Sequence, residues 1–442
     1  MKHFFILIIL LTSQMLLSQE SISEPSKLWT LDNLFDYALE NNITVKDAAL
    51  NKNIAEVDYS KTKSSRLPDL FGSASQTFSN GNSIDPITSD FVSDQIYSTN
   101  VSLNSSMTLF QGNQINNQIA QNELLLNQSA FLEEETKNSI IVSILENYLQ
   151  ILFAKEGIAI AENNLIASEK EVETAKARLD AGSIALSDYT EAQSQAATNQ
   201  YAVIAAKNTY QQYIITLKQL LELDPTEDIE IETLNDEVDY VYLELDRLDI
   251  YNKALDILPE VSASKIGVEV SEKELDIAKG AYLPSLSLVS SLGSGYTSIN
   301  DNNFSDQFNV NFNQRIGLSL SIPIFNRNQT KVAVQTAQIN IEKAQIYEQT
   351  IEKEVYKKVE TAYQNATSAQ EQLKAAEASK AAAEQTYKLA QKKYDLGGLS
   401  TTDLIISQNT YTNAQQNYLQ AKYLSILYHQ LLQFYQGNDI KL

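Results

Sequence analysis

Two stretches with the same layout decide the fold of this chain: Leu179-Asp180-Ala181-Gly182-Ser183-Ile184-Ala185-Leu186-Ser187-Asp188 and Tyr394-Asp395-Leu396-Gly397-Gly398-Leu399-Ser400-Thr401-Thr402-Asp403. In each, a glycine closes a long segment without proline, and an aspartate follows six residues later. Glycine readily adopts the left-handed conformation that ends a helix, and Ser, Thr or Asp caps the start of the next one. The sequence therefore predicts two antiparallel helical hairpins with these stretches at their tips.

The same offset between matching residues extends outward from the tips. Pro68 corresponds to Pro284, Phe110 to Phe325 and Gln193 to Gln408, at 215 or 216 residues. A register that holds to within one residue over so much of the chain indicates a tandem duplication. We expect a first repeat at 19–223 and a second at 248–436, joined by an acidic connector at 224–247 and followed by a short tail at 437–442.

Each repeat carries the same order of predicted elements. A helix (31–64 and 248–281) is followed by two short strands and then by a long helix, Asn113 to Asp180 or Gln329 to Asp395. At 1.5 Å per residue such a helix is a rod of roughly 100 Å. The second rod has apolar residues at coiled-coil spacing, which indicates close packing against other helices: Ile351, Val355, Val359, Ala362, Ala366, Ala369, Leu373, Ala376, Ala383, Tyr387, Ala390 and Tyr394.

The strands alternate between apolar and small polar residues. The apolar positions are Ile316, Leu318, Leu320, Ile322 and Ile324 in the second repeat, and Val101, Leu103, Met107 and Leu109 in the first. Period two with one fully apolar face is typical of a strand between lipid and a water-filled lumen. A half-buried strand of a soluble sheet gives the same pattern, and aromatic residues near the strand ends favour the membrane interpretation.

Composition excludes several functions. The chain of 442 residues has 33 Lys+Arg and 56 Asp+Glu, a net charge of −23, no cysteine and two histidines. Thiol chemistry, zinc–cysteine sites and iron–sulfur clusters need cysteine, and a nucleic-acid partner needs a cationic face. No nucleophile–histidine pair or glycine-rich phosphate loop points to an enzyme, and His429 is most simply a packing residue.

The chain begins like an exported protein. A basic lead is followed by an apolar run and by polar residues, so we expect a signal peptide at 1–18. After it, no apolar run is long enough for a membrane-spanning helix, so that entry into a membrane would require a closed β-barrel. The alternative is an exported coiled-coil adaptor or stalk. An adaptor would show one hairpin between β-rich halves, and a stalk would lack the returning helix.

The doubled pattern resembles the TolC-like outer-membrane efflux protein family. The similarity rests on the Gly-x-x-x-x-x-Asp-x-x-x-x-Gln turn of both repeats, the aromatic Tyr394 before the second turn, the duplicated order of elements, and the Leu-Pro before the first strand of each repeat. It implies an α+β membrane protein, a homotrimer in which four β-strands per chain form a 12-stranded outer-membrane barrel above a periplasmic α-helical barrel. It further implies the exit duct of a tripartite efflux or type I secretion system, with a periplasmic adaptor and an inner-membrane pump as partners and no cofactor or metal.

The resemblance also implies roles for residues at the tips. Asp403 matches an aspartate that faces the pore, where three copies would form a carboxylate ring; the alternative is a helix N-terminal aspartate stabilised by the dipole. Asp188 and Tyr394 match positions that lock the closed state. The family's locking arginine is replaced by Leu399, and a second pore aspartate found in some relatives by Ile406, so we expect a weaker polar latch and a single acidic ring.

The tip turns also match the docking sites for the adaptor's hairpins. The residues carried over are Gly182, Ser183, Leu186, Gly397, Gly398 and Ser400. The alternative is that these residues serve only the geometry of the turns. The transported substrate is left open by the sequence.

Overall fold

The computed structural model describes residues 28–84, 89–233 and 246–441. The predicted signal peptide and residues 234–245 of the acidic connector lie outside this range. The chain divides into two compact units. A helical unit comprises Met1–Lys46, Lys137–Lys253 and Lys358–Leu442, and a sheet unit comprises Asp47–Thr136 and Ala254–Lys357. Both repeats contribute to each unit, because the long helices α4 (Gln114–Asp180) and α9 (Gln329–Asp395) run through both.

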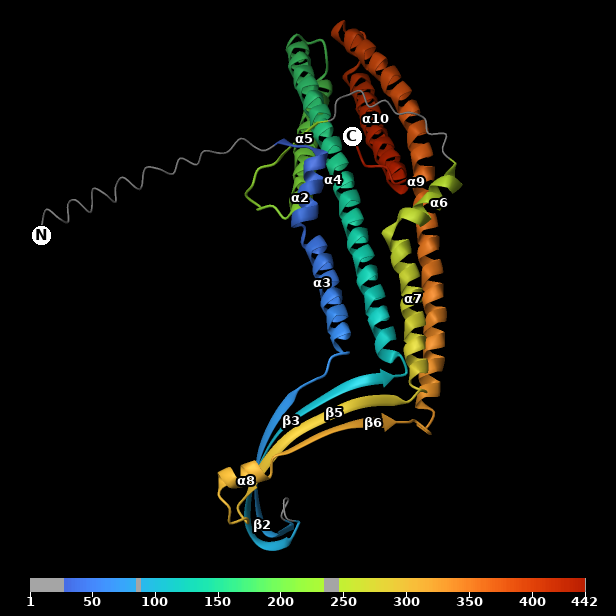
Figure 1. Cartoon of the computed structure of the whole chain (residues 1–442). Coiled ribbons are helices and arrows are strands. Elements are labelled where there is room, and N and C mark those ends of the chain that lie inside the picture. Colours follow the sequence, from blue (N-terminus) through green and yellow to red (C-terminus); the bar gives the residue numbers. More distant parts are fainter. Residues whose placement is uncertain (1–27, 85–88, 234–245, 442) are drawn as a thin grey trace, which may run out of the picture. The chain divides into compact units, whose positions relative to one another are not determined.

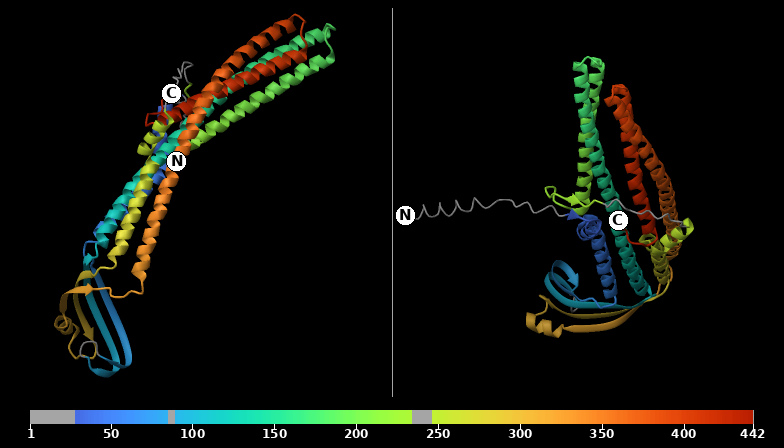
Figure 2. Two further views of the ribbon diagram at one scale, coloured as in Figure 1. Left: turned by 90° about the vertical axis from the view of Figure 1, so that its right-hand side faces the viewer. Right: turned by 90° about the horizontal axis from the view of Figure 1, so that it is seen from above.

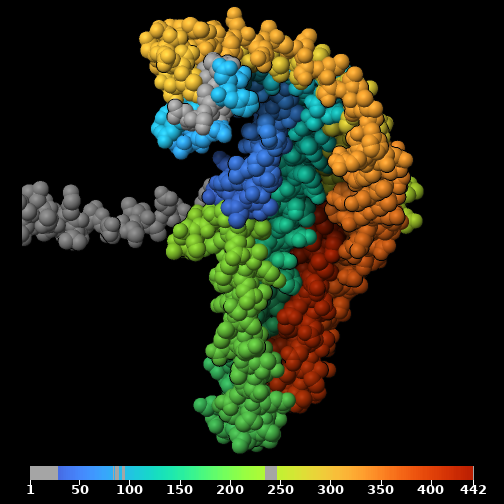
Figure 3. Space-filling model, turned by 90° about the horizontal axis from the view of Figure 1, so that it is seen from below, coloured from blue at the N-terminus to red at the C-terminus, as the bar shows by residue number. Residues whose placement is uncertain are grey.

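The helical unit contains the two predicted hairpins. In the first, α4 turns into α5 (Leu186–Leu221), and in the second α9 turns into α10 (Thr401–Tyr435). The hairpins lie side by side (Figure 2), and their side chains meet along their length (Figure 3). In this unit the predicted seam of α9 is largely confirmed, since Val359, Ala362, Ala369, Ala383 and Tyr394 are buried.

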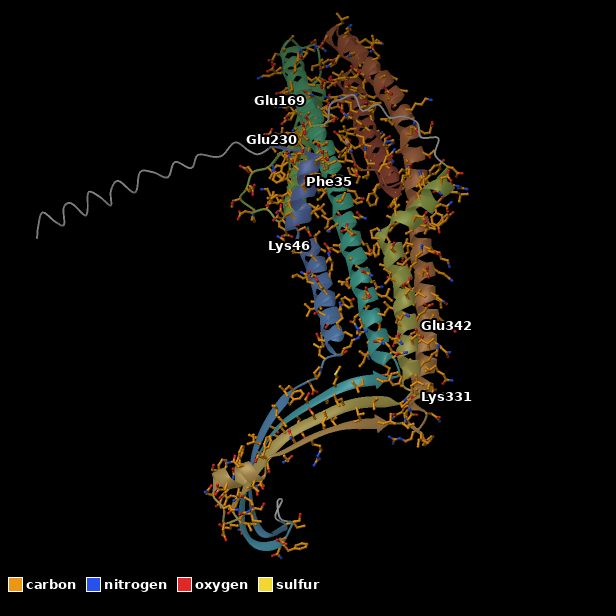
Figure 4. The ribbon with its side chains drawn as sticks, in the orientation of Figure 1. Phe35, Lys46, Glu169, Glu230, Lys331 and Glu342 are labelled. Carbon is orange, nitrogen blue, oxygen red and sulfur yellow. The ribbon has the colours of Figure 1, made fainter. Side chains whose placement is uncertain are left out.

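The base of the helical unit holds its main apolar core. Helix α2 (Leu31–Asn41) and the two-residue strands β1 (Leu28–Trp29) and β4 (Glu230–Ile231), which pair in parallel, pack there. The core includes Leu34, Leu145, Leu152, Leu217 and Ile426. Phe35 of α2, labelled in Figure 4, belongs to the same cluster. The apolar side chains that anchor the lower ends of the hairpins therefore come from both repeats.

The sheet unit is built on four antiparallel strands in the order β2-β3-β5-β6 (Figure 1). They are β2 (Phe71–Ile84), β3 (Phe91–Gln111), β5 (Ser285–Thr297) and β6 (Asn313–Ser321). The unit also holds most of α3 (Ile43–Ser64), helix α7 (Pro259–Gly280), the end of α6 (Arg247–Ile257) and the short α8 (Phe304–Val310).

Apolar side chains form rows across one face of the sheet. Leu103 lies opposite Leu292, and Met107, Leu288 and Leu318 form a second row. The alternation predicted for β3 fails at its end, because the register shifts between Thr108 and Phe110. Phe110, not Leu109, then lies opposite Leu286. An extra residue in one strand moves every later side chain to the other face.

Three other sequence-based expectations about the elements were wrong, and one helix was not predicted at all. The helix predicted at 31–64 is broken at Asn42, whose carboxamide oxygen accepts bonds from the amides of Thr44 and Val45 (2.8 and 3.3 Å) and so caps α3. The helix predicted at 248–281 breaks before Pro259, which stands at the first position of α7. Helix α8 was not predicted, and β6 ends before Ile322 and Ile324.

Within the part of the chain that the structure describes, every helix is too short or too polar to cross a membrane.

Candidate functional site: the paired hairpin tips

The two hairpin tips have the same backbone geometry. Gly182 has φ +69° and Gly397 φ +76°, both in the left-handed region. At the first tip the Gly182 amide donates to the Leu179 carbonyl (2.9 Å) and the Ser183 amide to the Arg178 carbonyl (2.9 Å). This pair of bonds is the Schellman motif, which satisfies carbonyls at the end of a helix.

The second tip repeats this motif one repeat later. The Gly397 amide donates to the Tyr394 carbonyl (2.9 Å), and the Gly398 amide to the Lys393 carbonyl (2.8 Å). A side chain at either tip glycine would meet no atom within 4 Å. Glycine is therefore required at both tips by the positive φ alone, as the sequence predicted.

The caps of the returning helices differ. Ser400 caps α10: its hydroxyl accepts from the Asp403 amide (3.1 Å) and donates to the Asp403 carboxylate (2.7 Å). Ala185 stands at the corresponding position of α5 and has no polar side chain, so only the Asp188 carboxylate acts there, accepting from the Ala185 amide (3.2 Å). The first tip therefore has one capping bond, from a backbone amide to a carboxylate, whereas at the second tip the Ser400 hydroxyl makes both bonds.

A single arginine joins the two tips. Arg178, in the last turn of α4, donates from Nη2 to the carbonyl oxygens of Tyr394 (2.5 Å) and Asp395 (3.1 Å) at the end of α9. Its guanidinium lies over the Tyr394 ring, 4.4 Å from the centroid. A cation at a helix C-terminus is stabilised by the helix dipole, and one over a ring by the ring's quadrupole. Arg178 thus binds the end of one hairpin to the end of the other.

Further polar bonds connect the hairpins below Arg178. The Thr402 hydroxyl donates to the Glu191 carboxylate (2.8 Å). The Gln195 carboxamide donates to that of Asn409 (3.3 Å), and the Gln408 carboxamide to the Asn164 carbonyl (3.4 Å). Apolar packing accompanies them in the second hairpin, where Tyr387, Ala390, Tyr394 and Leu404 form a small buried cluster.

A hollow of about 350 Å³ lies between the two turns. Among the docking candidates, Ser183, Gly397 and Ser400 line it, together with Arg178 and Asp188. Gly182, Leu186 and Gly398 do not line it; Leu186 is nevertheless 63% exposed. The hollow gathers polar groups of both repeats at one end of the helical unit.

The candidate lock and gate residues are placed as follows. No hydrogen bond joins Asp188 and Tyr394 in the described chain: the carboxylate of Asp188 caps α5, and the Tyr394 hydroxyl is buried without a partner. Asp403 is exposed and engaged with Ser400. Leu399 packs against the small buried cluster. Sequence reasoning missed Arg178. The signal available was that the corresponding residue of the second repeat is a lysine, Lys393, which is exposed in the structure.

No group of three or more His, Asp and Glu residues in the described ranges is arranged to hold a metal ion.

Comparison with known proteins supplies the family. The model of the family described as "Outer membrane efflux protein" matches residues 34–222 and 250–433, one segment in each repeat. The chain belongs to the outer membrane efflux protein family. Its duplicated α+β fold is that of the TolC-like outer-membrane channels, and its place is the outer membrane. Members of the family are passive channels, so the chain is not an enzyme.

Individual relatives are distant but cover nearly the whole chain. Outer membrane efflux protein BepC of Brucella suis biovar 1 (strain 1330) is 26% identical over 94% of this chain and 86% of BepC. Outer membrane protein TolC of Escherichia coli (strain K12) is 21% identical over 92% of this chain and 82% of TolC. Among solved structures, the outer membrane protein VceC of Vibrio cholerae has a TM-score of 0.78 at 17% identity, covering 93% of this chain and 97% of VceC.

Proposed function

We propose that three copies of this chain form the exit duct of a tripartite efflux or type I secretion system. In this proposal the duct conducts substrates passively to the exterior, receives them through a periplasmic adaptor from an inner-membrane pump, and closes at the hairpin tips. The substrate is chosen by the pump, and the relatives named for pyoverdine export and for alkaline protease secretion illustrate how varied such cargo is.

The unpaired edges of the sheet support the proposal that several copies of the chain assemble. Within the described chain β2 and β6 each pair on one side only, which leaves a row of free backbone groups on each edge. The strand β6 also carries exposed apolar side chains: Ile316 is 75% exposed and Leu318 is 66% exposed. Free edges of this kind require partners, and four strands are too few to close a barrel. Three copies would supply twelve strands and leave no edge.

The tip contacts support the proposal for a gate. Arg178 and the bonds from Thr402 and Gln195 join the first hairpin of a chain to its second. If the tips of the trimer widen by moving one hairpin away from the other, these bonds must break. Arg178 would then act as the latch in place of the arginine that is absent at Leu399. The latch expected from the sequence, Asp188 with Tyr394, would contribute through capping and through the ring under Arg178.

Asp403 supports the proposal for an acidic ring. Its carboxylate is exposed in the single chain, and its bond to Ser400 fixes its direction at the start of α10. Three symmetric carboxylates would attract cations at the constriction. We expect Asp403→Ala to lower the cation-over-anion permeability ratio in a planar bilayer, while Ile406→Ala, at a nearby exposed position, leaves it unchanged. Unchanged selectivity in Asp403→Ala would remove the ring from the proposal.

The hollow between the turns supports the proposal for adaptor docking. Ser183, Gly397 and Ser400 line it, and they belong to the set inferred from the family. Gly182 and Gly398 would act by shaping the turns, and the exposed Leu186 by apolar contact with an adaptor hairpin. Crosslinking from Ser183→Cys to a co-expressed adaptor would support this role, and Gln193→Cys, exposed on α5, is the control.

The full-length protein tests the proposed function as a whole. Cells are fractionated, the protein is extracted from the outer membrane in detergent, its mass is measured by light scattering, and it is reconstituted in a planar bilayer. We expect a trimer that passes ions. A monomer found in the soluble periplasmic fraction would instead favour the coiled-coil adaptor or structural binding protein considered as the alternative.

A further inference from the structure

A buried carboxyl group lies between the two hairpins, two helical turns below Arg178. Glu171 of α4 is only 8% exposed, and its Oε1 is 3.5 Å from the hydroxyl of Tyr387 on α9. Glu169, labelled in Figure 4, marks the same level of α4 but is exposed. A carboxylate is costly to bury unless it is paired or hydrogen-bonded. Glu171 is one of the few acidic side chains buried in the described chain, and the only one of them in the upper half of the first hairpin.

The surrounding hydrogen bonds have a fixed direction. The Tyr387 hydroxyl accepts from the Gln391 carboxamide (3.0 Å), so its own proton is available to Glu171. The Tyr387 ring is stacked on Tyr411 of α10, with ring centroids 5.8 Å apart. Glu171 from one hairpin therefore meets a tyrosine that is held in place by both helices of the other.

No cation on the packed helices neutralises Glu171 among the described contacts. On α9 the charge that acts on Glu171 is that of Asp395, which is negative; Lys388 is engaged with Glu384 (2.5 Å). Arg178, on the same helix as Glu171, is bound to the carbonyls at the end of α9.

The other two helices bring no cation to this level, since the first on α5 is Lys207 and the first on α10 is Lys422; Glu191 of α5, beside Ala192, is an anion that accepts from Thr402. On α10 the titratable neighbour is the phenol of Tyr411. On α5 the bond between Asn199 and Asn164 sets the antiparallel pairing and brings the buried Ala192 to the level of Glu171.

These surroundings favour the neutral acid. Burial raises the pKa of the Glu171 carboxyl to about 7; the hydrogen bond from Tyr387 opposes this shift, and the charge of Asp395 adds to it. Burial, together with the charge of Glu171, likewise raises the pKa of Tyr387 above its ordinary value. Both groups are therefore accommodated in their neutral forms while the hairpins are in contact.

We propose that Glu171 and Tyr387 form a proton-controlled contact between the hairpins, which holds the tips together in acid and releases them as the medium becomes alkaline. The proposal rests on the proposed duct function and adds a regulation to it. Below pH 4.5, the ordinary value for Glu, the group is neutral whether the contact is closed or open. Between that value and about 7, only the open state ionises freely, so rising pH favours opening. Above about 7 the carboxyl group is ionised in both states. The closed state then bears the whole free-energy cost of burying a charged carboxylate.

The test combines current with distance. The chain has no cysteine, so spin labels can be attached at Lys176→Cys on α4 and Lys392→Cys on α9, both exposed. Inter-label distance and bilayer current are recorded from about pH 5 to about pH 8. In the otherwise unchanged protein both should increase with pH, with the open-to-closed ratio rising by at most about tenfold per pH unit for each Glu171.

Three variants decide the outcome. Glu171→Gln, a permanently neutral form, should keep the low-pH distance and current throughout. Tyr387→Phe removes a bond that lowers the pKa of Glu171 and so stabilises the ionised contact; it should therefore increase the label distance and the current at about pH 8. Glu169→Gln is the exposed control and should respond as the unchanged protein does.

A pH response that persists in Glu171→Gln, or one that disappears equally in Glu169→Gln, would overturn the inference. If no protein conducts at any pH while the label distances still respond through Glu171, the duct function fails and the proton-controlled contact stands.

Discussion

The two hairpin tips share one backbone and differ in what their side chains do. Both end a long helix with a Schellman motif on a glycine at positive φ. At the first tip, Arg178 reaches out to the carbonyls of the second. At the second, Lys393 stands at the corresponding position and is exposed, while Ser400 and Asp403 cap each other. The backbone geometry requires glycine at both tips, whereas only the first tip carries an arginine that donates to backbone carbonyls of the other tip.

The largest expected effect concerns the apolar support under the second tip. Leu404 is 1% exposed and belongs to the small buried cluster with Tyr387 and Tyr394. Leu404→Ala should lower the free energy of local opening at that tip by about 2–5 kcal/mol, because it leaves a cavity. Hydrogen–deuterium exchange of the turn measures it. Leu186→Ala, at an exposed position of the first tip, is the control; equal effects of the two substitutions would show that the tips are supported alike.

Substitution of the tip glycines tests the feature that both tips share, the turn on a glycine at positive φ. Gly182→Ala and Gly397→Ala each place a side chain in open space, so only the left-handed conformation is penalised. We expect each to destabilise its turn by about 1 kcal/mol, measured by the same exchange experiment. Gly398→Ala serves as the control, because Gly398 is not at positive φ. A loss at one tip only would show that the turns are not equivalent.

The smallest expected effect concerns the different caps of the two returning helices, α10 and α5. Ser400→Ala removes the hydroxyl that accepts from the Asp403 amide, and should weaken the start of α10 by roughly 1 kcal/mol. Ser187→Ala, in the first turn of α5, is the control, because Ala185 and not Ser187 stands at the cap position of that helix; it should change little. Nuclear magnetic resonance or exchange rates of the first-turn amides would report both. Comparable losses would mean that Ser187 caps α5 after all.

The sequence predicts those features that arise from neighbouring residues or from a repeated pattern. The bounds of α4 and α9, both tip turns and the order of elements follow from proline-free segments, glycines and the register of the duplication. Breaks at Asn42 and Pro259 also had local causes, a capping carboxamide and a proline, yet the apolar periodicity across them favoured one continuous helix.

What the sequence could not predict depends on packing between distant residues. Arg178 and Tyr394 are 216 residues apart, as are Glu171 and Tyr387. Periodicity shows that these helices have partners, and leaves open which side chains meet. The register shift at Leu109 is a similar case, because the alternation of apolar residues continues through it in the sequence and only the pairing with β5 reveals the change.

The current through single trimers of Arg178→Ala, compared with Lys393→Ala and the unchanged protein, tests the central claim most directly. Arg178→Ala removes two bonds to the end of α9 and the contact with the Tyr394 ring, while Lys393→Ala removes an exposed charge from the equivalent position. The account predicts trimers that conduct in all three cases, with the time spent open increased about tenfold or more in Arg178→Ala alone. Trimers that do not conduct, or an equal current in all three proteins, would contradict it.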